Sequence, residues 1–278
     1  AARIDSLPVI ARRQRCCRCD RKADGEGVTM KKLVSKAIAL SVLVLTGFAT
    51  PSTAVQAAEV ETPLPETHFS FDGIFGTWDK AELQRGFQVY NEVCAACHSL
   101  KLLSFRNLEQ IGFSEEEVKA IAEQYTVFNG PNAFGEVEEV TAKPSDRIRG
   151  KGVYETAPDL SLMSKARAGG AEYVNALMIG YHEAPADEEP APGTYYNIYF
   201  PGKQIAMPQP LFGDDVSYAD GTETTVEQLS KDVSAFLAWA AEPHMEARKR
   251  MGVKVLLFLI VFTGMLYAVK RKIWADLH

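Results

Sequence analysis

Apolar residues recur at three- and four-residue spacing in several stretches of the chain, which is the pattern of amphipathic helices. These stretches predict helices over 80–97, 115–125, 171–180 and 225–241. The first begins after Asp79, with Glu82 as a capping-box partner, and its apolar face carries Gly86, where another helix could approach closely. Residues 126–157 and 183–210 are rich in Gly, Pro and charge and predict long loops. The pattern therefore indicates a mainly α domain with long connecting segments.

The last apolar stretch is continuous rather than periodic. Residues 251–269 contain Lys254 as their only charge. At a rise of ~1.5 Å per residue such a stretch just crosses a hydrocarbon core of ~30 Å, with the lysine near one end. Cations flank it at 248–250 and at 270–272, so charge alone orients it poorly. We expect one C-terminal transmembrane helix over 251–269, followed by a tail over 270–278.

A shorter apolar run near the N-terminus has the features of an export signal. Two lysines follow Met30, the run covers 37–49, and small residues lead to Ala57. We expect a signal peptide over 30–57, cleaved after Ala57, because the run is too short to span a membrane comfortably. Residues 1–29 are expected to be a non-native upstream extension. Export would place residues 58–247 in the periplasm of a bacterium, anchored by a single pass in the inner membrane, with the C-terminus in the cytoplasm.

The formal net charge of −6 hides a strong asymmetry. Residues 58–247 hold 13 basic and 31 acidic residues, which gives this segment a net charge of −18. A domain that acidic repels nucleic acid and attracts cationic partners. Acidic side chains cluster at 136–139 and 187–189 and predict a docking surface, although exposed charges can also serve solubility alone.

The motif with the clearest chemistry is Cys94-Ala-Ala-Cys97-His98. Two cysteines at this spacing followed by histidine are the attachment site of a c-type haem: each thiol forms a thioether, and the imidazole ligates iron. A redox dithiol or half of a zinc site is the alternative for a Cys-X-X-Cys pair. The adjoining His98, the export signal and the absence of a second cysteine pair after residue 57 argue against both.

The second axial ligand of such an iron has several candidates among the methionines and histidines of the exported domain. These are Met163, Met178, Met207, Met245, His68, His182 and His244. Methionine more often fills a core than binds a metal. Met207 differs because it lies in the proline-bounded stretch 201–210, which cannot form regular helix and could hold a thioether against a flat ring. Histidine–methionine ligation would give a closed, high-potential iron suited to electron transfer.

Beyond the haem motif, the chain resembles the cytochrome c1 family, the haem subunits of bacterial cytochrome bc1 complexes. The resemblance rests on residues 69–76, 84–98, 157–161 and 166–170, on Tyr199-Phe-Pro-Gly202 and Ala240-Ala-Glu-Pro243, and on the anchor entry at 248–252. It implies a cytochrome c-like haem domain in which the helices at 80–97 and 225–241 cross. It also implies that Met207 is the sixth ligand, that Arg167 contacts a haem propionate, and that Pro158 and Tyr173 line the haem pocket.

The resemblance further implies a function and a set of partners. One covalently bound haem c would pass electrons from the Rieske iron–sulfur protein to a soluble cationic cytochrome c. Cytochrome b and membrane lipid would be the other partners, with no nucleic acid. The chain would have no substrate site of its own and would act as an enzyme only within the quinol–cytochrome c oxidoreductase complex. A free-standing membrane-tethered carrier, or a haem enzyme or sensor with an open axial position, are the alternatives.

Overall fold

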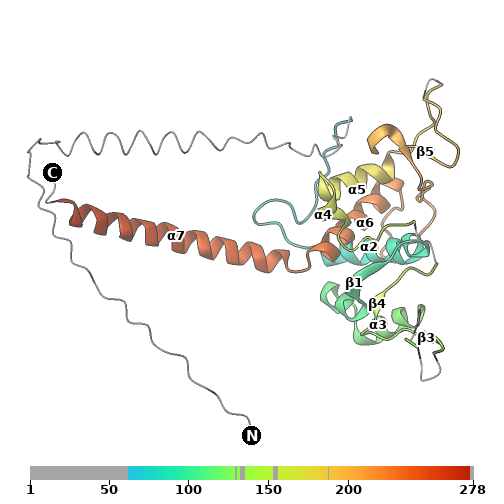
Figure 1. The fold of residues 1–278 in the computed structure, drawn as a ribbon, viewed down its shortest axis with the longest axis horizontal. Coiled ribbons are helices and arrows are strands. Elements are labelled where there is room, and N and C mark those ends of the chain that lie inside the picture. Colours follow the sequence, from blue (N-terminus) through green and yellow to red (C-terminus); the bar gives the residue numbers. More distant parts are fainter. Residues whose placement is uncertain (1–61, 129, 132–134, 153–155, 187, 276–278) are drawn as a thin grey trace, which may run out of the picture. The chain divides into compact units, whose positions relative to one another are not determined.

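The computed structural model describes residues 62–275, except 129, 132–134, 153–155 and 187. The predicted upstream extension at 1–29, the predicted signal peptide at 30–57 and the last three residues of the tail lie outside the described residues. Within them the mainly α prediction is confirmed (Figure 1). The α-helices are α2 (Lys80–Glu92), α3 (Glu115–Ala122), α4 (Met163–Ala166), α5 (Gly170–Ile179), α6 (Val226–Ala241) and α7 (Met245–Ile273). The 3-10 helices are η1 (Cys94–Ala96), η2 (Phe105–Ile111) and η3 (Pro201–Lys203).

Helices α2 and α6 pack against each other at the centre of the domain, as the resemblance implied. A Cβ atom on Gly86 would lie 2.0 Å from the carbonyl oxygen of Asp232, so only glycine permits this separation of the two backbones. The Phe236 ring lies 5.5 Å from Phe87 and 5.8 Å from Tyr90, measured between centroids. The predicted close approach at Gly86 is therefore confirmed, and aromatic packing surrounds it.

A buried ion pair fixes the same crossing. The Asp232 side chain has no exposed surface and accepts two hydrogen bonds from Arg85, from Nε at 2.9 Å and from Nη2 at 3.2 Å. Gln228 donates a third bond to this carboxylate at 3.0 Å. Hydrogen bonding to Asp232 raises the pKa of the Arg85 guanidinium. A paired guanidinium and carboxylate thus join α2 to α6 where an unpaired charge would be costly.

The first helix starts where it was predicted to start, but its capping partner differs and it ends earlier. Asp79 is its N-cap and accepts from the amide of Ala81 at 2.9 Å, as expected of a cap. The Glu82 carboxylate, however, accepts from the Ser70 hydroxyl at 2.8 Å, so the predicted reciprocal capping-box bond is not the one it makes. The α-helix ends at Glu92 instead of continuing to residue 97, because the chain tightens into the 3-10 turn η1.

The segments predicted as loops contain short paired strands. In the described residues the pairs are β1 (Leu100–Ser104) with β4 (Arg147–Ile148), β2 (Thr126–Phe128) with β3 (Glu139–Thr141), and β5 (Tyr195–Tyr196) with β6 (Gln204–Ile205). All three pairs are antiparallel. Strands of two to five residues show too few alternations to stand out in the sequence. Predicting 126–157 and 183–210 entirely as loop was therefore wrong, and β1, which lies outside both stretches, was not predicted.

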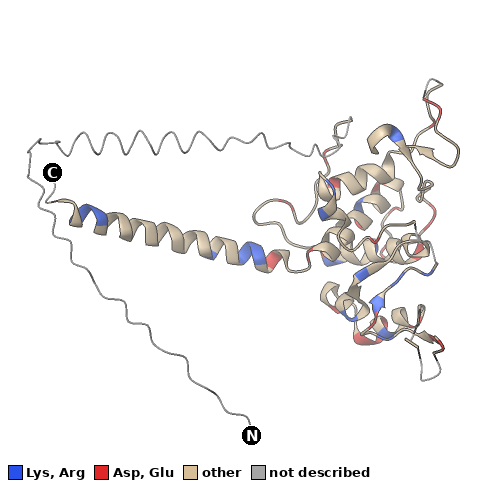
Figure 2. Ribbon diagram, viewed as in Figure 1, with Lys and Arg blue, Asp and Glu red and all other residues tan. Residues whose placement is uncertain are grey.

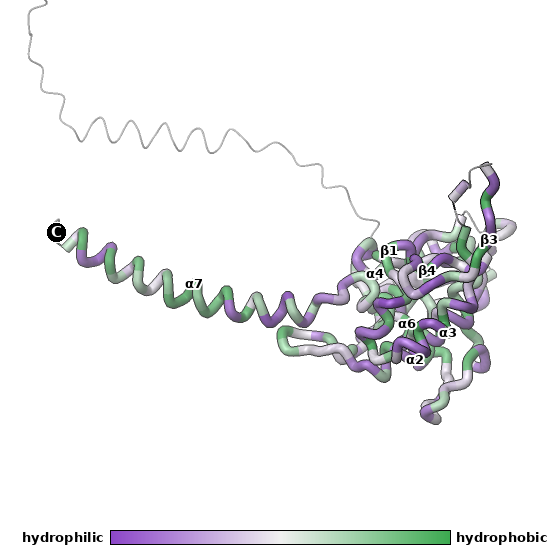
Figure 3. The backbone as a smooth tube through the Cα atoms, turned by 90° about the horizontal axis from the view of Figure 1, so that it is seen from below, coloured by the Kyte–Doolittle hydropathy of each residue, from purple (hydrophilic) through white to green (hydrophobic). Residues whose placement is uncertain are grey.

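Helix α7 runs for 29 residues, and every described side chain from Met251 onward is exposed. Lys and Arg gather at both of its ends, and the tube between them is hydrophobic (Figures 2 and 3). This is the one helix of the described residues that is long and apolar enough to cross a membrane. The Glu242 carboxylate accepts from Lys165 at 2.6 Å and from Arg248, which ties α4 and the start of α7 to the end of α6.

Candidate haem site

The two cysteines of the haem motif lie on one tight turn at the end of α2. Residues 94–96 form η1, and the amides of Cys97 and His98 both donate to the carbonyl of Cys94, at 3.1 Å and 2.8 Å. Cys94 begins this turn and Cys97 directly follows it, so both side chains project from one short segment. Both thiols are free of disulfide, and burial raises the pKa of the Cys94 thiol to about 12, so it is protonated at neutral pH. The turn thus presents two unpaired thiols within four residues.

The imidazole of His98 is oriented by a backbone carbonyl. Its Nδ1 lies 2.8 Å from the carbonyl oxygen of Pro158. Because a carbonyl can only accept, Nδ1 carries the proton, and the lone pair of Nε2 is left for a metal. Pro158 was predicted to line the pocket; in the structure its main chain also sets the histidine tautomer. No sequence pattern could have indicated this role, because every residue has a carbonyl.

Tyr181, which the sequence analysis did not single out, lies near Tyr173 and contacts Met207. Tyr173 is buried on α5, and burial raises the pKa of its hydroxyl, while the hydrogen-bonded guanidinium of Arg167 acts in the opposite direction. Burial also raises the pKa of Tyr181, and the nearby hydroxyl of Tyr173 adds to that effect. The Tyr181 hydroxyl donates to the carbonyl oxygen of Met207 at 3.0 Å. Tyr181 therefore holds the main chain of the predicted ligand and lies near Tyr173.

The proline-bounded stretch 201–210, here called the strap, carries Met207. The small sheet of β5 and β6 holds the base of this strap. Tyr196 pairs with Gln204 there, and the side chain of the buried Asn197 donates to the carbonyl of Leu177 in α5 at 2.8 Å. The Met207 side chain is half-buried and packs against the hydrophobic core. The strap is thus fixed to α5 on one side and to the core on the other, which is what a stable thioether ligand requires.

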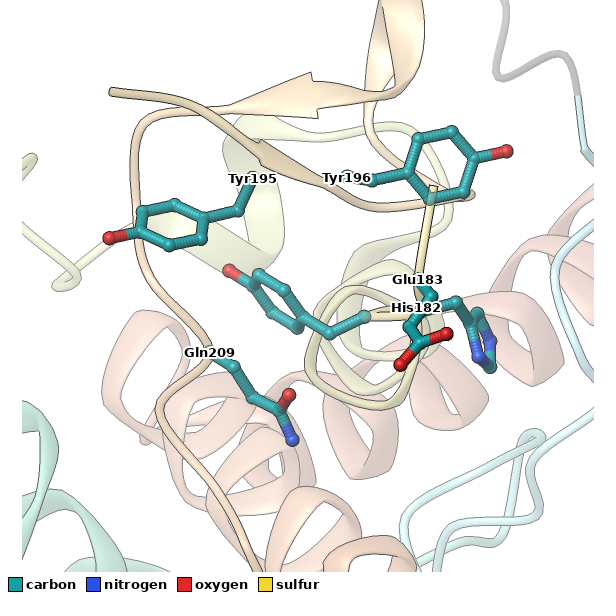
Figure 4. Close-up of a pocket in the computed structure, with 6 residues that line it drawn as sticks. His182, Glu183, Tyr195, Tyr196 and Gln209 are labelled. Carbon is teal, nitrogen blue, oxygen red and sulfur yellow. The ribbon is translucent and has the colours of Figure 1, made fainter. Parts of the chain in front are cut away.

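A surface pocket opens beside this strap (Figure 4). Its lining comes from the segment after α5, from β5 and from the end of the strap: Tyr181, His182, Glu183, Tyr195, Tyr196 and Gln209. None of the seven predicted site residues lines it. Its one direct link to the candidate site is the hydrogen bond from Tyr181 to the Met207 carbonyl.

The other ligand candidates occupy ordinary positions. Met178 and Met245 are buried and Met163 packs half-buried against the core, whereas His68, His182 and His244 are exposed on the surface. The predicted residues instead form two groups, one at Cys94, Cys97, His98 and Pro158 and the other at Arg167, Tyr173 and Met207. Unpaired thiols on one short segment, an imidazole with a free Nε2 and a thioether on a fixed strap suit a covalently attached haem. The residues present therefore fit this cofactor.

Comparisons with known proteins agree with this chemistry. The model of the cytochrome C1 family matches residues 69–277. The chain is 41% identical over 250 residues to cytochrome c1 of Rhodospirillum rubrum, covering 80% of this chain and 92% of the relative. It is 44% identical over 236 residues to a mitochondrial cytochrome c1 haem protein of Arabidopsis thaliana, covering 81% of this chain and 77% of the relative. With the cytochrome b/c1 of Bradyrhizobium diazoefficiens it shares 43% over 246 residues, which is 77% of this chain but only 36% of that longer protein.

Proposed function

The chain belongs to the cytochrome c1 family, so it is the haem-bearing, electron-transferring subunit of a bc1 complex, and we propose which of its residues perform that task. Cys94 and Cys97 hold the haem covalently, and His98 and Met207 are its axial ligands. The observation that carries this proposal is the hydrogen bond from His98 Nδ1 to the Pro158 carbonyl, because it leaves Nε2 as the metal-binding atom. The bound haem supplies a one-electron carrier.

The protein's own residues keep the site closed and rigid. Tyr181 holds the main chain of Met207 at 3.0 Å, which restrains the strap and excludes water or gas from the sixth position. Pro158 holds the imidazole ring in one tautomer and one orientation. An electron carrier benefits from this rigidity because its geometry then changes little between the two oxidation states. An enzyme or sensor with an open axial position would need the strap to be loose.

Arg167 is proposed to neutralise a haem propionate, with Tyr173 as its neighbour. The guanidinium is exposed and donates to the carbonyl of Ala166 at 3.2 Å, which leaves several N–H groups for a carboxylate. Hydrogen bonding between Arg167 and Tyr173 gives the side chain a defined position beside the buried face of α5. A planar guanidinium in such a place can bind a carboxylate through two parallel hydrogen bonds.

We propose the partners from the family to which the chain belongs, and the orientation from the expected export signal together with α7, the membrane-spanning candidate among the described residues. We place the haem domain in the periplasm, α7 in the bacterial inner membrane and the C-terminus in the cytoplasm. Cytochrome b would pack beside α7, the Rieske iron–sulfur protein would donate electrons, and a soluble cationic cytochrome c would accept them. The net charge of −18 over residues 58–247 supports a cationic acceptor. Glu188, which pairs with Lys203 at 2.7 Å, and the exposed Glu189 each carry one of these negative charges.

A detergent purification with an optical spectrum tests the proposal. We expect the c-type haem to travel with a cytochrome b, and carbon monoxide to leave the spectrum of the reduced chain unchanged because Met207 closes the site. A chain that purifies alone from intact membranes would indicate a free-standing carrier. A reduced haem that binds carbon monoxide readily would indicate an open axial position instead.

A further inference from the structure

A tight loop in front of α2 presents two large apolar side chains to solvent. Ile74 is 70% exposed and Phe75 is 87% exposed, although neither lies in the apolar anchor. Single exposed hydrophobic residues are common and need no explanation. Here the two are adjacent and stand at the tip of a turn that begins at Gly73, whose φ of 68° suits glycine. The question is what covers this tip in the cell.

The loop is rigid, so the exposure of its tip is a fixed feature. The rings of Phe69, Phe71 and Trp78 stack in series behind it, with centroids 5.0 Å and 4.6 Å apart. The Asp72 carboxylate accepts from the amide of Phe69 at 2.7 Å. A Cβ on Gly76 would lie 2.1 Å from the carbonyl oxygen of Asp72, so the two sides of the turn are in close contact.

Three hydrogen bonds fasten this loop to the first turns of α7. Lys249 Nζ donates to the carbonyl oxygens of Phe71 at 2.6 Å and Gly76 at 3.1 Å, and the amide of Trp78 donates to Glu246 at 3.0 Å. Lys249 precedes the apolar stretch at Met251 by two residues, a rise of roughly 3 Å along the helix. Figures 1 and 3 both show the loop beside the first turns of α7, and Figure 3 colours its tip hydrophobic.

We propose that Ile74 and Phe75 insert into the lipid at the membrane surface and form a second contact with the bilayer beside the anchor. The three hydrogen bonds to α7 hold the tip at the level where this helix becomes continuously apolar. Burying Ile74 and Phe75 in lipid therefore removes apolar surface from water without moving the domain. Large apolar side chains such as Phe bury at the boundary between lipid headgroups and acyl chains. The contact would also limit rotation of the haem domain about α7.

The proposal rests on α7 being in the membrane, and its test separates the two claims. The photoreactive residue p-benzoylphenylalanine replaces Phe75 in the full chain, and native membranes are irradiated. The matched control carries the same residue in place of Phe128, which is 62% exposed in β2, on the hairpin with β3 that Figures 1 and 3 place away from α7. An unchanged haem spectrum establishes that both variants fold.

The expected result is covalent adducts to lipid at position 75 and none at position 128. An adduct from position 75 to another protein chain, cytochrome b included, would overturn the proposal, because the tip would then be covered by protein. The absence of any adduct would also overturn it, because the tip would face water. Release of the chain by alkaline carbonate would show instead that α7 itself is not inserted, which contradicts the proposed membrane topology.

Discussion

Replacement of Gly86 by alanine should destabilise the domain, although alanine is the better helix former. A Cβ at this position would lie 2.0 Å from the Asp232 oxygen and 2.8 Å from the Cβ of Phe236, whereas real Cβ contacts are essentially never shorter than 3.0 Å. The obstacles are a backbone carbonyl and a core residue, so no flexible side chain can move aside. Helices α2 and α6 must separate.

The magnitude follows from two opposing effects. Overpacking a core costs about 3 kcal/mol at the upper end of the usual range, which suits a clash with backbone. The gain in helix propensity from glycine to alanine is about 1 kcal/mol. The expected net loss is therefore about 2 kcal/mol in the free energy of unfolding. For a domain of this size that corresponds to a fall of about 4–8 °C in Tm.

Thermal unfolding of the full haem-bound chain in detergent, followed by circular dichroism, measures the effect. The control is Gly252→Ala, since Gly252 is also helical but has no atom within 4 Å of its added Cβ. We expect this control to leave Tm unchanged or slightly raised. A Gly86→Ala chain that unfolds at the wild-type temperature or above it would refute the close crossing of α2 and α6.

The remaining predictions concern pH, the strap and the acceptor. Glu82→Gln should raise Tm at pH 7: burial raises the pKa of the Glu82 carboxyl above 4.5, so the folded protein binds this proton more tightly than the unfolded chain does. The protonated Glu82 carboxyl therefore contributes its full stability below pH 4.5, and this contribution is lost as pH rises through the folded pKa. The rise in Tm caused by Glu82→Gln should vanish in thermal scans below pH 4.5. A rise in Tm that is the same at every pH would contradict this reasoning. Tyr181→Phe should lower the free energy of unfolding by about 0.5–1.5 kcal/mol and let carbon monoxide bind the reduced iron in place of Met207. Continued exclusion of the gas with an unchanged Tm would argue against a role for the hydrogen bond from Tyr181 to Met207. In stopped-flow experiments, oxidation by a basic cytochrome c should slow about 10-fold or more as salt rises. Glu188→Gln and Glu189→Gln should each lower the low-salt rate, whereas a salt-insensitive rate would remove the steering claim.

The sequence predicted α2, α3, α5 and α6 because each has an apolar face, whereas the four-residue α4 was not predicted. Asp79 caps α2, and Pro243 follows α6 closely, so both lie near the expected boundaries. The close approach at Gly86 could be predicted because glycine is a poor helix former. Its presence on an apolar helix face therefore indicates a close contact with another helix. The tightening at Cys94 could not, since α and 3-10 turns have similar side-chain patterns over three residues.

The missed part of the site depends on tertiary contacts that leave little trace in sequence. Pro158 acts through its carbonyl, and Tyr181 acts because the chain after α5 returns beneath the strap. Tyr181 lies between the helix predicted at 171–180 and the loop predicted from 183, so nothing marked its hydroxyl as a tether. The three short sheets were missed for a related reason: their strands are specified by their partners and not by their own periodicity.

The central claim is that Met207 closes the iron site, and Met207→Leu tests it most directly. The matched control is Met178→Leu, the same chemical change at a buried position on α5. With haem attachment confirmed by its spectrum, the Met207→Leu chain should have a lower reduction potential and bind carbon monoxide when reduced, while the Met178→Leu chain should behave as wild type. A Met207→Leu chain with the wild-type potential and no carbon monoxide binding would show that another residue holds the sixth position.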